Sequence, residues 1–296
     1  FILSENLTNS QQIEEVFRKG KVREVIVFEP DFGNNLLKNG VAQLQIITDA
    51  SDPNTASIVY SYTQSIVNDY LLEINRGNEL PLMIIPQTEM RYNQELKSVF
   101  MFVPGIITII LMLVSAMMTS ISITREKELG TMEILLVSPV KPAQIIVGKV
   151  IPYVVLSFVS AVMILLLSYF VFHMPFSGSL ILLLLVTILF IVLALSLGVF
   201  ISTVSKTQQV AMLLSMFALL LPTILLSGFI FPIENMPLIL QYVSHIMPPK
   251  WFVIIIKNII IKGNGIEVIW KEVLILFGMA MFFILLSIKK FKIRLE

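Results

Sequence analysis

Residues 98–124 read SVFMFVPGIITIILMLVSAMMTSISIT, a run of 27 residues without an Asp, Glu, Lys or Arg. Because a helix needs about 20 apolar residues to cross the hydrocarbon core of a bilayer, this run is long enough for one span. A dense charged cluster, REKE, follows at residues 125–128, and residues 150–205 form a second run without those four residue types. The stretch therefore predicts a membrane protein whose apolar spans are separated by short polar segments.

The composition of the whole chain agrees with this class. Of its 296 residues, 56% are hydrophobic and 14% are charged, whereas soluble domains carry roughly 25% charged residues. Residues 1–97 contain 13 acidic and 8 basic side chains, while residues 98–296 contain 7 acidic and 13 basic ones. We therefore expect two domains in different surroundings, an α/β domain with its linker over 1–97 and a transmembrane domain over 98–296.

The expected fold class is a polytopic α-helical membrane protein with five spans in this chain. Residues 232–267 are interrupted by prolines and too broken for a span, so we expect short re-entrant or interfacial helices there, on the outer side. The five candidate spans lie at about 99–123, 150–172, 180–204, 209–231 and 268–288.

The distribution of Lys and Arg predicts the orientation, because these residues mark cytoplasmic loops. The 124–149 loop carries four of them, and the C-terminal tail carries Lys289, Lys290, Lys292 and Arg294. Both segments are therefore expected in the cytoplasm, and five spans then place residues 1–97 outside it. Because export of such a domain needs a preceding span, we expect a sixth span upstream of Phe1 in the intact protein.

Residues 1–97 have the pattern of a small α/β domain. VREVIVF at 22–28 and VAQLQIIT at 41–48 are rich in β-branched residues and are expected to be strands, with a further strand candidate at 82–85. Residues 31–39 can form a short helix that Gly40 stops.

A longer helix is expected to start at Asp52 and Pro53, a capping acid followed by a proline in the first turn. It carries one apolar stripe at a spacing of four residues, formed by Ile58, Tyr62, Ile66 and Tyr70. The acidic residues of this domain are scattered and no histidine is present in it. We therefore expect a folded spacer or docking domain without a catalytic site.

Several functions are disfavoured by what the chain lacks. Ion-coupled carriers keep ionisable side chains within the bilayer, but the first four candidate spans contain no Asp, Glu, Lys or Arg. No phosphate-binding loop of the GxxxxGK[ST] type and no cysteine occurs. His173 lies at a span end and is expected to be an interfacial residue, and His245 has no second ligand nearby. We expect no catalytic residue, no metal, no directly bound cofactor and no nucleic-acid partner, so energy for uphill transport would come from another chain.

The third candidate span carries a stripe of small residues. Ala194, Gly198 and Ser202 recur at a spacing of four and share one helix face. Small residues at this spacing let two helices approach closely. The stripe can serve packing within the chain or a seam between two subunits, and the sequence leaves both possibilities open.

The charged cluster begins a longer motif that joins charge to an apolar patch. The pattern predicts an amphipathic helix along the cytoplasmic membrane surface, ended by the proline. An interfacial anchor is one interpretation of such a helix. The residues that define the motif are Arg125, Glu126, Lys127, Glu128, Gly130, Thr131, Glu133, Leu135, Leu136, Ser138 and Pro139.

This motif resembles the signature cytoplasmic loop of ABC type-2 exporter permeases. FEPDF at 28–32 and TDASDPNTA at 48–56 look like the extracytoplasmic domain of the subclass with a large first outer loop. SGFIFP at 227–232 resembles the end of the penultimate span in that family. The resemblance covers essentially the whole chain.

The resemblance implies a multi-pass half-transporter of six spans in the bacterial cytoplasmic (inner) membrane. It would pair with a second permease subunit, as a homodimer or a heterodimer, and each subunit would dock a separate cytoplasmic ATPase that supplies ATP and Mg. The 124–149 loop would be the coupling helix, with Glu126, Glu128 and Glu133 as candidate docking and transmission contacts and Gly130 allowing a tight bend. The cargo would be hydrophobic or amphipathic and would move outward, and residues 1–97 could meet a periplasmic adaptor.

Two other functions stay open on the sequence alone. The first is a carrier or channel that does not use ATP, which would transport its solute without any ATPase. The second is a membrane scaffold or sensor whose outer domain binds a ligand. That function predicts ligand binding by residues 1–97 without ATP-dependent flux.

Overall fold

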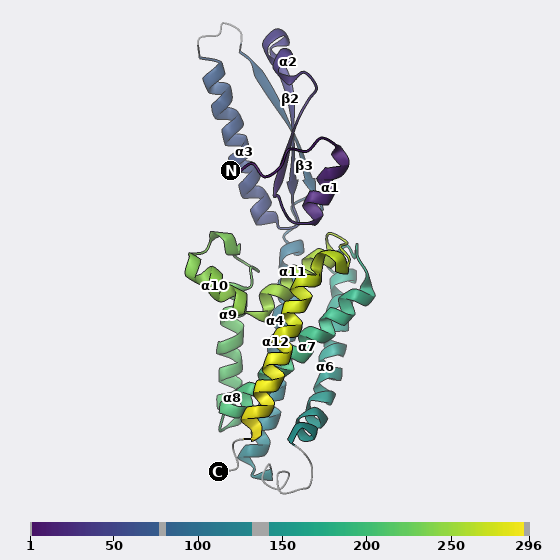
Figure 1. Ribbon diagram of the computed structural model, residues 1–296, viewed down its shortest axis with the longest axis vertical. Helices are drawn as coiled ribbons and strands as arrows, with labels where there is room; N and C mark the ends of the chain where they lie inside the picture. The colour runs from purple at the N-terminus through teal and green to yellow at the C-terminus, as the bar shows by residue number, and fades with distance from the viewer. Residues whose placement is uncertain (1, 77–80, 132–141, 293–296) are drawn as a thin grey trace. The chain divides into compact units, whose positions relative to one another are not determined.

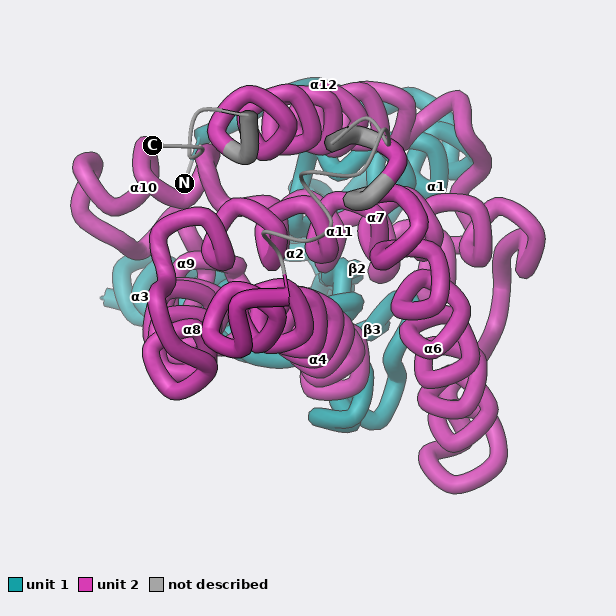
Figure 2. The backbone as a smooth tube through the Cα atoms, turned by 90° about the horizontal axis from the view of Figure 1, so that it is seen from below, with its two compact units in different colours: residues 1–101 teal, residues 102–296 magenta. Residues whose placement is uncertain are grey.

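The computed structural model describes residues 2–76, 81–131 and 142–292 of the chain (Figure 1). The chain divides into two compact units, residues 1–101 (unit 1) and residues 102–296 (unit 2), which Figure 2 colours separately. The boundary between the units falls within helix α4 (Val99–Glu128), three residues after its start.

Unit 1 is built around a sheet of three strands, β1 (Glu24–Phe28), β2 (Val41–Asp49) and β3 (Met83–Arg91). The strand order is β1-β2-β3, with β1 antiparallel and β3 parallel to the central β2. All three strands expected from the sequence are present, but β3 extends six residues beyond the predicted end at Ile85.

Three helices accompany the sheet: α1 (Ser10–Arg18), α2 (Phe32–Asn39) and α3 (Pro53–Ile74). Gly40 follows α2 with φ of +74°, a left-handed conformation that glycine adopts at low cost, so the predicted stop is present. The Asp52 side chain accepts a hydrogen bond from the Thr55 backbone N–H at 3.2 Å, as expected of a cap for α3. Helix α1 was not anticipated from the sequence.

The core of unit 1 forms on one face of β2, to which alternate side chains of this strand point. Ala42, Leu44 and Ile46 point to one face, where Leu36 of α2 and Ile84 of β3 complete a buried cluster. The side chains of α3 that pack there are Tyr60, Val67, Leu71 and Ile74. Helix α3 therefore packs on the sheet through a different face from its predicted apolar stripe.

Ile47 of β2 belongs to a separate cluster with Ile13 and Phe17 of α1. Phe17 is fully buried there. Helix α1 has nine residues, and only Ile13, Val16 and Phe17 form its buried face. So short a pattern is easy to miss in the sequence. The Asn9 cap, which accepts from Gln11 N–H at 3.2 Å, was the available signal.

Unit 2 is a helical membrane protein. Among the described residues, five helical segments are long and apolar enough to cross a bilayer, the number expected from the sequence. They are α4, α6 (Pro142–Phe170), α7 (Leu180–Val204), the combined segment Gln208–Leu226 and α12 (Ile266–Lys292).

The fourth of these segments is irregular. It begins as α8 (Gln208–Ser215), widens into the π-helical turn Met216–Leu220, and ends as α9 (Leu221–Leu226). Pro222 cannot donate to the carbonyl four residues earlier and its ring crowds that carbonyl, so a widened turn just before it relieves the clash. The helix stops at Leu226, short of the expected end at 231, and Gly228 follows in the left-handed region with φ of +72°.

The segment expected to be broken contains the 3-10 turn Ile233–Asn235 and two short helices, α10 (Leu238–Ile246) and α11 (Pro248–Ile260). The helices are bent by 82° at the Pro248–Pro249 pair, the geometry of a broken span or a re-entrant loop. Phe252 of α11 is fully buried and stacks on Phe190 of α7 with ring centroids 3.9 Å apart. This stack fixes α11 inside the helical packing of unit 2.

Candidate functional site: the polar end of helix α4

Helix α4 continues past its apolar run and includes the first part of the charged motif. Arg125–Glu128 form its last turn, so these residues do not belong to a separate surface helix as the sequence suggested. The helix ends with hydrogen bonds from Leu129 N–H to the Arg125 carbonyl oxygen (2.9 Å) and from Gly130 N–H to the Lys127 carbonyl oxygen (3.2 Å). Gly130 has φ of +72°, which lets the chain turn away from the helix axis.

The second part of the motif lies outside the described residues, because these exclude 132–141. Glu133, Leu135, Leu136, Ser138 and Pro139 therefore have no structural account here. Thr131 is described and exposed, and its hydroxyl donates to the Glu126 carbonyl oxygen at 3.2 Å. The site can be built from Arg125 to Thr131.

Lys127 connects α4 to the end of α7. Its ammonium group donates to the carbonyl oxygen of Ser202, in the last turn of α7. The last carbonyls of a helix have no partner within the helix, and the negative end of the helix dipole favours a cation. Lys127 satisfies both requirements.

Glu128 connects α4 to the start of α8. Its carboxylate accepts hydrogen bonds from the Gln208 backbone N–H at 2.9 Å and from the Gln208 side-chain amide at 3.1 Å. Gln208 is the first residue of α8. A carboxylate there satisfies an unpaired N–H group and lies at the positive end of the helix dipole.

Glu126 connects α4 to α6 through an ion pair with Lys149. The two side chains are 26% and 23% exposed, so this pair is screened by water less than a surface pair is. Arg125, by contrast, is exposed. Three successive residues thus join the end of α4 to three other helices, because consecutive residues on a helix point in directions about 100° apart.

A second layer of contacts lies deeper in the same helices. The Ser115 hydroxyl donates to the Ser157 hydroxyl of α6 at 2.8 Å, and the hydroxyls of Ser120 and Ser215 of α8 are also 2.8 Å apart. Figure 2 shows α4 beside α8 in unit 2. All four serines are buried. Hydroxyl pairs of this kind hold apolar helices together, and sequence reasoning missed them although the serines stand out in a charge-free run.

Gly198, at the centre of the small-residue stripe of α7, lies against α4 within the chain. Ala194 and Ser202 are fully buried. A methyl group added at Gly198 would lie 3.0 Å from Ala116 Cα of α4 and closer still to the Ala116 carbonyl oxygen. At Gly198 this face is therefore occupied within the chain, and a packing role for the whole stripe stays a prediction.

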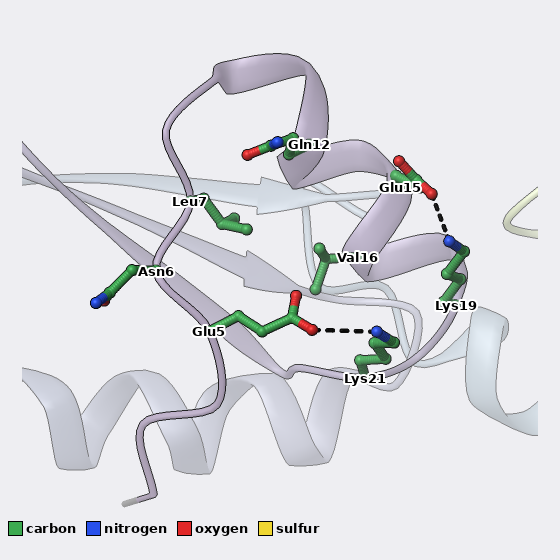
Figure 3. Close-up of a pocket in the computed structure, with 8 residues that line it drawn as sticks. All are labelled: Glu5, Asn6, Leu7, Gln12, Glu15, Val16, Lys19 and Lys21. Atoms are coloured by element: carbon green, nitrogen blue, oxygen red, sulfur yellow. Dashed lines mark hydrogen bonds and ion pairs between the residues drawn. The ribbon is translucent and has the colours of Figure 1, made fainter.

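Unit 1 holds a shallow hollow of about 290 Å³ between the N-terminal segment and α1 (Figure 3). Its charged lining residues are paired with one another: Lys21 with Glu5 at 3.1 Å, and Lys19 with Glu15. A charged ligand would have to displace these pairs. Within the described part of the chain, no group of three or more His, Asp or Glu residues could hold a metal ion.

Five apolar helices, four of which the charged motif joins at one end, together with a small α/β unit, define a polytopic helical membrane protein. Comparison with known proteins specifies the class further. The sequence profile described as ABC-2 family transporter protein matches residues 2–289, so the chain belongs to the ABC-2 transporter family.

Two relatives from Escherichia coli (strain K12) exceed 30% identity. The chain is 34% identical over 291 residues to the protein named "Probable multidrug ABC transporter permease YbhS", covering 97% of this chain and 77% of that protein. It is 32% identical over 266 residues to "Probable multidrug ABC transporter permease YbhR", covering 90% and 72%. "Inner membrane transport permease YhhJ" from the same organism is 29% identical over 300 residues, covering 99% and 79%.

Membership of this family makes the chain a membrane subunit of an ABC transporter. Permease subunits of such transporters generally lack ATPase activity of their own, and the family implies ATP use through a partner ATPase and pairing of permease subunits.

Proposed function

We propose that the chain is the permease subunit of an ATP-driven exporter that moves a hydrophobic or amphipathic molecule outward. A separate cytoplasmic ATPase docks on the 124–149 region and hydrolyses Mg-ATP, and a second permease subunit completes the path. Residues 1–97 lie outside the cytoplasm and the C-terminus lies inside. The names of the relatives, which include "multidrug" and "inner membrane", support this assignment.

The observation that carries the proposal is the position of the charged motif at the base of a loop. In the sequence, residues 132–141 connect Thr131, three residues after the end of α4, to Pro142 at the start of α6. The Glu126–Lys149 ion pair bridges these two helices at the base of that loop. A partner that moves the loop therefore moves α4 and α6 together, while Lys127 and Glu128 carry the displacement to α7 and α8.

This arrangement refines the role of the glutamates. Glu126 and Glu128 are bonded within the chain, so their role in the proposal is transmission, and contact with the ATPase falls to the loop itself. Arg125, which is exposed, is the charged residue of the described motif best placed for docking. The absence of Asp, Glu, Lys and Arg from residues 150–205 supports an uncharged or amphipathic cargo.

The test uses charge reversal at the ion pair. The chain is purified from membranes with the ATPase that accompanies it and reconstituted into liposomes. Replacing Glu126→Lys is expected to lower the ATPase rate coupled to the permease at least tenfold, because it places two cations at the base of the loop. The double variant Glu126→Lys with Lys149→Glu is expected to recover most of that rate.

Rescue by the double variant separates transmission from direct docking, because a docking glutamate would not be restored by a change on α6. The matched control is Glu95→Lys, at an exposed acid of unit 1, which should retain the full rate. Membrane levels of each variant report on insertion. Unchanged coupling in Glu126→Lys, or a chain that copurifies with no ATPase, would contradict the proposal.

A further inference from the structure

The outward face of α3 carries two parallel rows of residues at a spacing of four. One row is the apolar stripe Ile58, Tyr62, Ile66 and Tyr70, whose residues are 46%, 62%, 54% and 49% exposed. The neighbouring row consists of Ser57, Ser61 and Ser65, which are also exposed. A ridge of large side chains therefore runs beside a shallow row of small ones.

The hydroxyl groups of the serine row already donate hydrogen bonds within the helix. Each hydroxyl donates to the carbonyl oxygen four residues earlier: Ser57 to Pro53 at 2.9 Å, Ser61 to Ser57 at 2.7 Å, and Ser65 to Ser61 at 3.0 Å. Hydroxyls that donate to a carbonyl oxygen of their own helix do not require another hydrogen-bond acceptor for that proton. The row can therefore be covered by apolar side chains without leaving a hydroxyl proton unpaired.

A membrane span does not account for this exposed apolar ridge. Helix α3 belongs to unit 1 and is not among the helices of the described chain that are apolar enough to cross a bilayer. It packs on the sheet through a different face, formed by Tyr60, Val67, Leu71 and Ile74. Contiguous exposed apolar surface on a unit of this kind marks an interaction site more often than chance.

The shape of the face indicates what covers it. Helices pack most often by laying an i±4 ridge of one into an i±4 groove of the other, with axes crossing at about −50°. A face that holds a large ridge beside a small row is complementary to a copy of itself, as the two-fold symmetry of a homodimer requires. We propose that this face of α3 pairs with α3 of a second copy of the chain.

The lack of charge on this face limits the electrostatic cost of pairing two copies. Residues 1–97 carry a net charge of −5, so two such units repel each other, and the repulsion is weakest where the facing surfaces carry no charge. Residues 53–68 of α3 contain no Asp, Glu, Lys or Arg, and the acids Asp69 and Glu73 lie at the C-terminal end of the serine row. Helices that cross at the middle of α3 diverge toward their ends, which keeps these acids apart.

The size of the face sets the strength of the contact. Four half-exposed Ile and Tyr side chains offer roughly 400 Å² per copy, or about 800 Å² for the pair. Stable dimers bury about 1,200–2,000 Å². The α3 contact is therefore an auxiliary one that forms when the membrane units are already paired and the local concentration is high. It rests on the pairing of permease subunits in the proposed function.

The test exploits the complete lack of cysteine in the chain. A single cysteine at Ser61, in the centre of the face, is oxidised with copper phenanthroline in native membranes of cells producing the full chain. A covalent dimer is expected on non-reducing gels. A matched cysteine at Lys38, exposed on α2 of the same unit, should give at least tenfold less dimer.

Charge variants give a second readout. Ile66→Arg in every copy should abolish the Ser61→Cys crosslink, and so should Ile66→Glu. Producing the two variants together, with different tags, should restore it between the unlike copies. The proposal is overturned by equal crosslinking at positions 38 and 61, by a crosslink to a different protein, or by a Ser61→Cys thiol that stays monomeric. The assay needs no ATP hydrolysis, so failure of ATPase coupling would leave its result readable.

Discussion

At the scale of single residues, the charged motif acts through helix ends. Lys127 meets the carbonyl end of α7 and Glu128 meets the amide end of α8, so each charge lies where the helix dipole favours it. Exchanging the two residues would place each charge against the wrong dipole end. The order of charges in the motif therefore has a structural reason apart from any contact with a partner.

Glu24 of β1 differs from Lys127 and Glu128, because the fold disfavours the ionised form of its carboxyl group. Burial raises the pKa of Glu24, and hydrogen bonds from the Thr63 and Thr48 hydroxyls offset this only in part. Thr63 lies on α3, so this carboxyl group joins the helix to the sheet. Unit 1 therefore contains a pH-dependent contribution to its stability.

The sign of that contribution follows from the raised pKa. Stability from neutral Glu24 is fully present below the unfolded-state pKa and is lost as the pH rises through the higher folded-state pKa. We expect Glu24→Gln, which keeps a neutral hydrogen-bonding group, to remove this loss. Hydrogen exchange of β1 and α3, corrected for the intrinsic rate, should show protection falling in the original chain as the pH rises above the usual titration range of a glutamate, but not in the variant. Identical pH profiles would refute this account.

At the scale of elements, α4 contacts its neighbours through small and hydroxyl residues as well as through buried apolar side chains such as Ile107 and Leu111. Ser115 and Ser120 pair with serines of α6 and α8, and Gly198 lets α7 approach the backbone of α4 at Ala116. Close backbone contact of this kind tolerates little added volume. The close approach explains why a glycine stands in the middle of a span.

Adding one methyl group at this contact should separate the two helices. Gly198→Ala is expected to destabilise unit 2 by about 1–3 kcal/mol, because the methyl group meets backbone atoms that cannot rotate away. Gly278→Ala on α12 is the control, since a methyl group there meets nothing within 4 Å and improves helix propensity. Thermal unfolding in detergent should show a lower Tm for the first variant only. Equal Tm values for both variants would contradict the close contact.

At the scale of the whole molecule, the two units differ in net charge and in their expected surroundings. The unit that contains the sheet is acidic, whereas the helical unit carries its Lys and Arg at the ends of spans. This asymmetry is the basis of the proposed orientation, with the 124–149 and 205–209 segments inside and residues 1–97 outside.

Cysteine labelling can test this orientation, again because the chain has no cysteine. Lys38→Cys in unit 1 and Lys206→Cys between α7 and α8 are both at exposed positions. A membrane-impermeant maleimide should label Lys38→Cys in intact spheroplasts and Lys206→Cys only after the membrane is permeabilised. The reverse pattern would show that the orientation is inverted and would place the charged motif on the wrong side for an ATPase.

Much of the fold was predictable because it depends on local pattern. The number of apolar helices, the strands and the Asp52 cap were all expected and are all present. Helix α1 was missed because its pattern is short, and the end of the fourth segment was misplaced because apolar residues continue past Leu226 into a turn at Gly228. Hydrophobicity marks what can enter a bilayer and does not record where a helix stops.

The candidate site was predictable only in part. The motif drew attention to Glu126 and Glu128, but their partners, Lys149 and Gln208, are 23 and 80 residues away in the chain. The interpretation of Ala194, Gly198 and Ser202 stayed open on the sequence, which does not show that Gly198 lies against α4. Likewise, the apolar stripe of α3 was visible in the sequence, but which face of α3 meets the sheet was not.

The sequence by itself determined that the chain enters a membrane, how many apolar helices it contains and which transporter family it resembles, because hydropathy and motif order are properties of short segments. The tertiary structure decided that the charges of the motif join α4 to α6, α7 and α8, and that the stripe of α3 is left uncovered in unit 1. These features depend on which distant segments meet. The partner of a charged or apolar side chain is fixed by helix packing, which no single segment specifies.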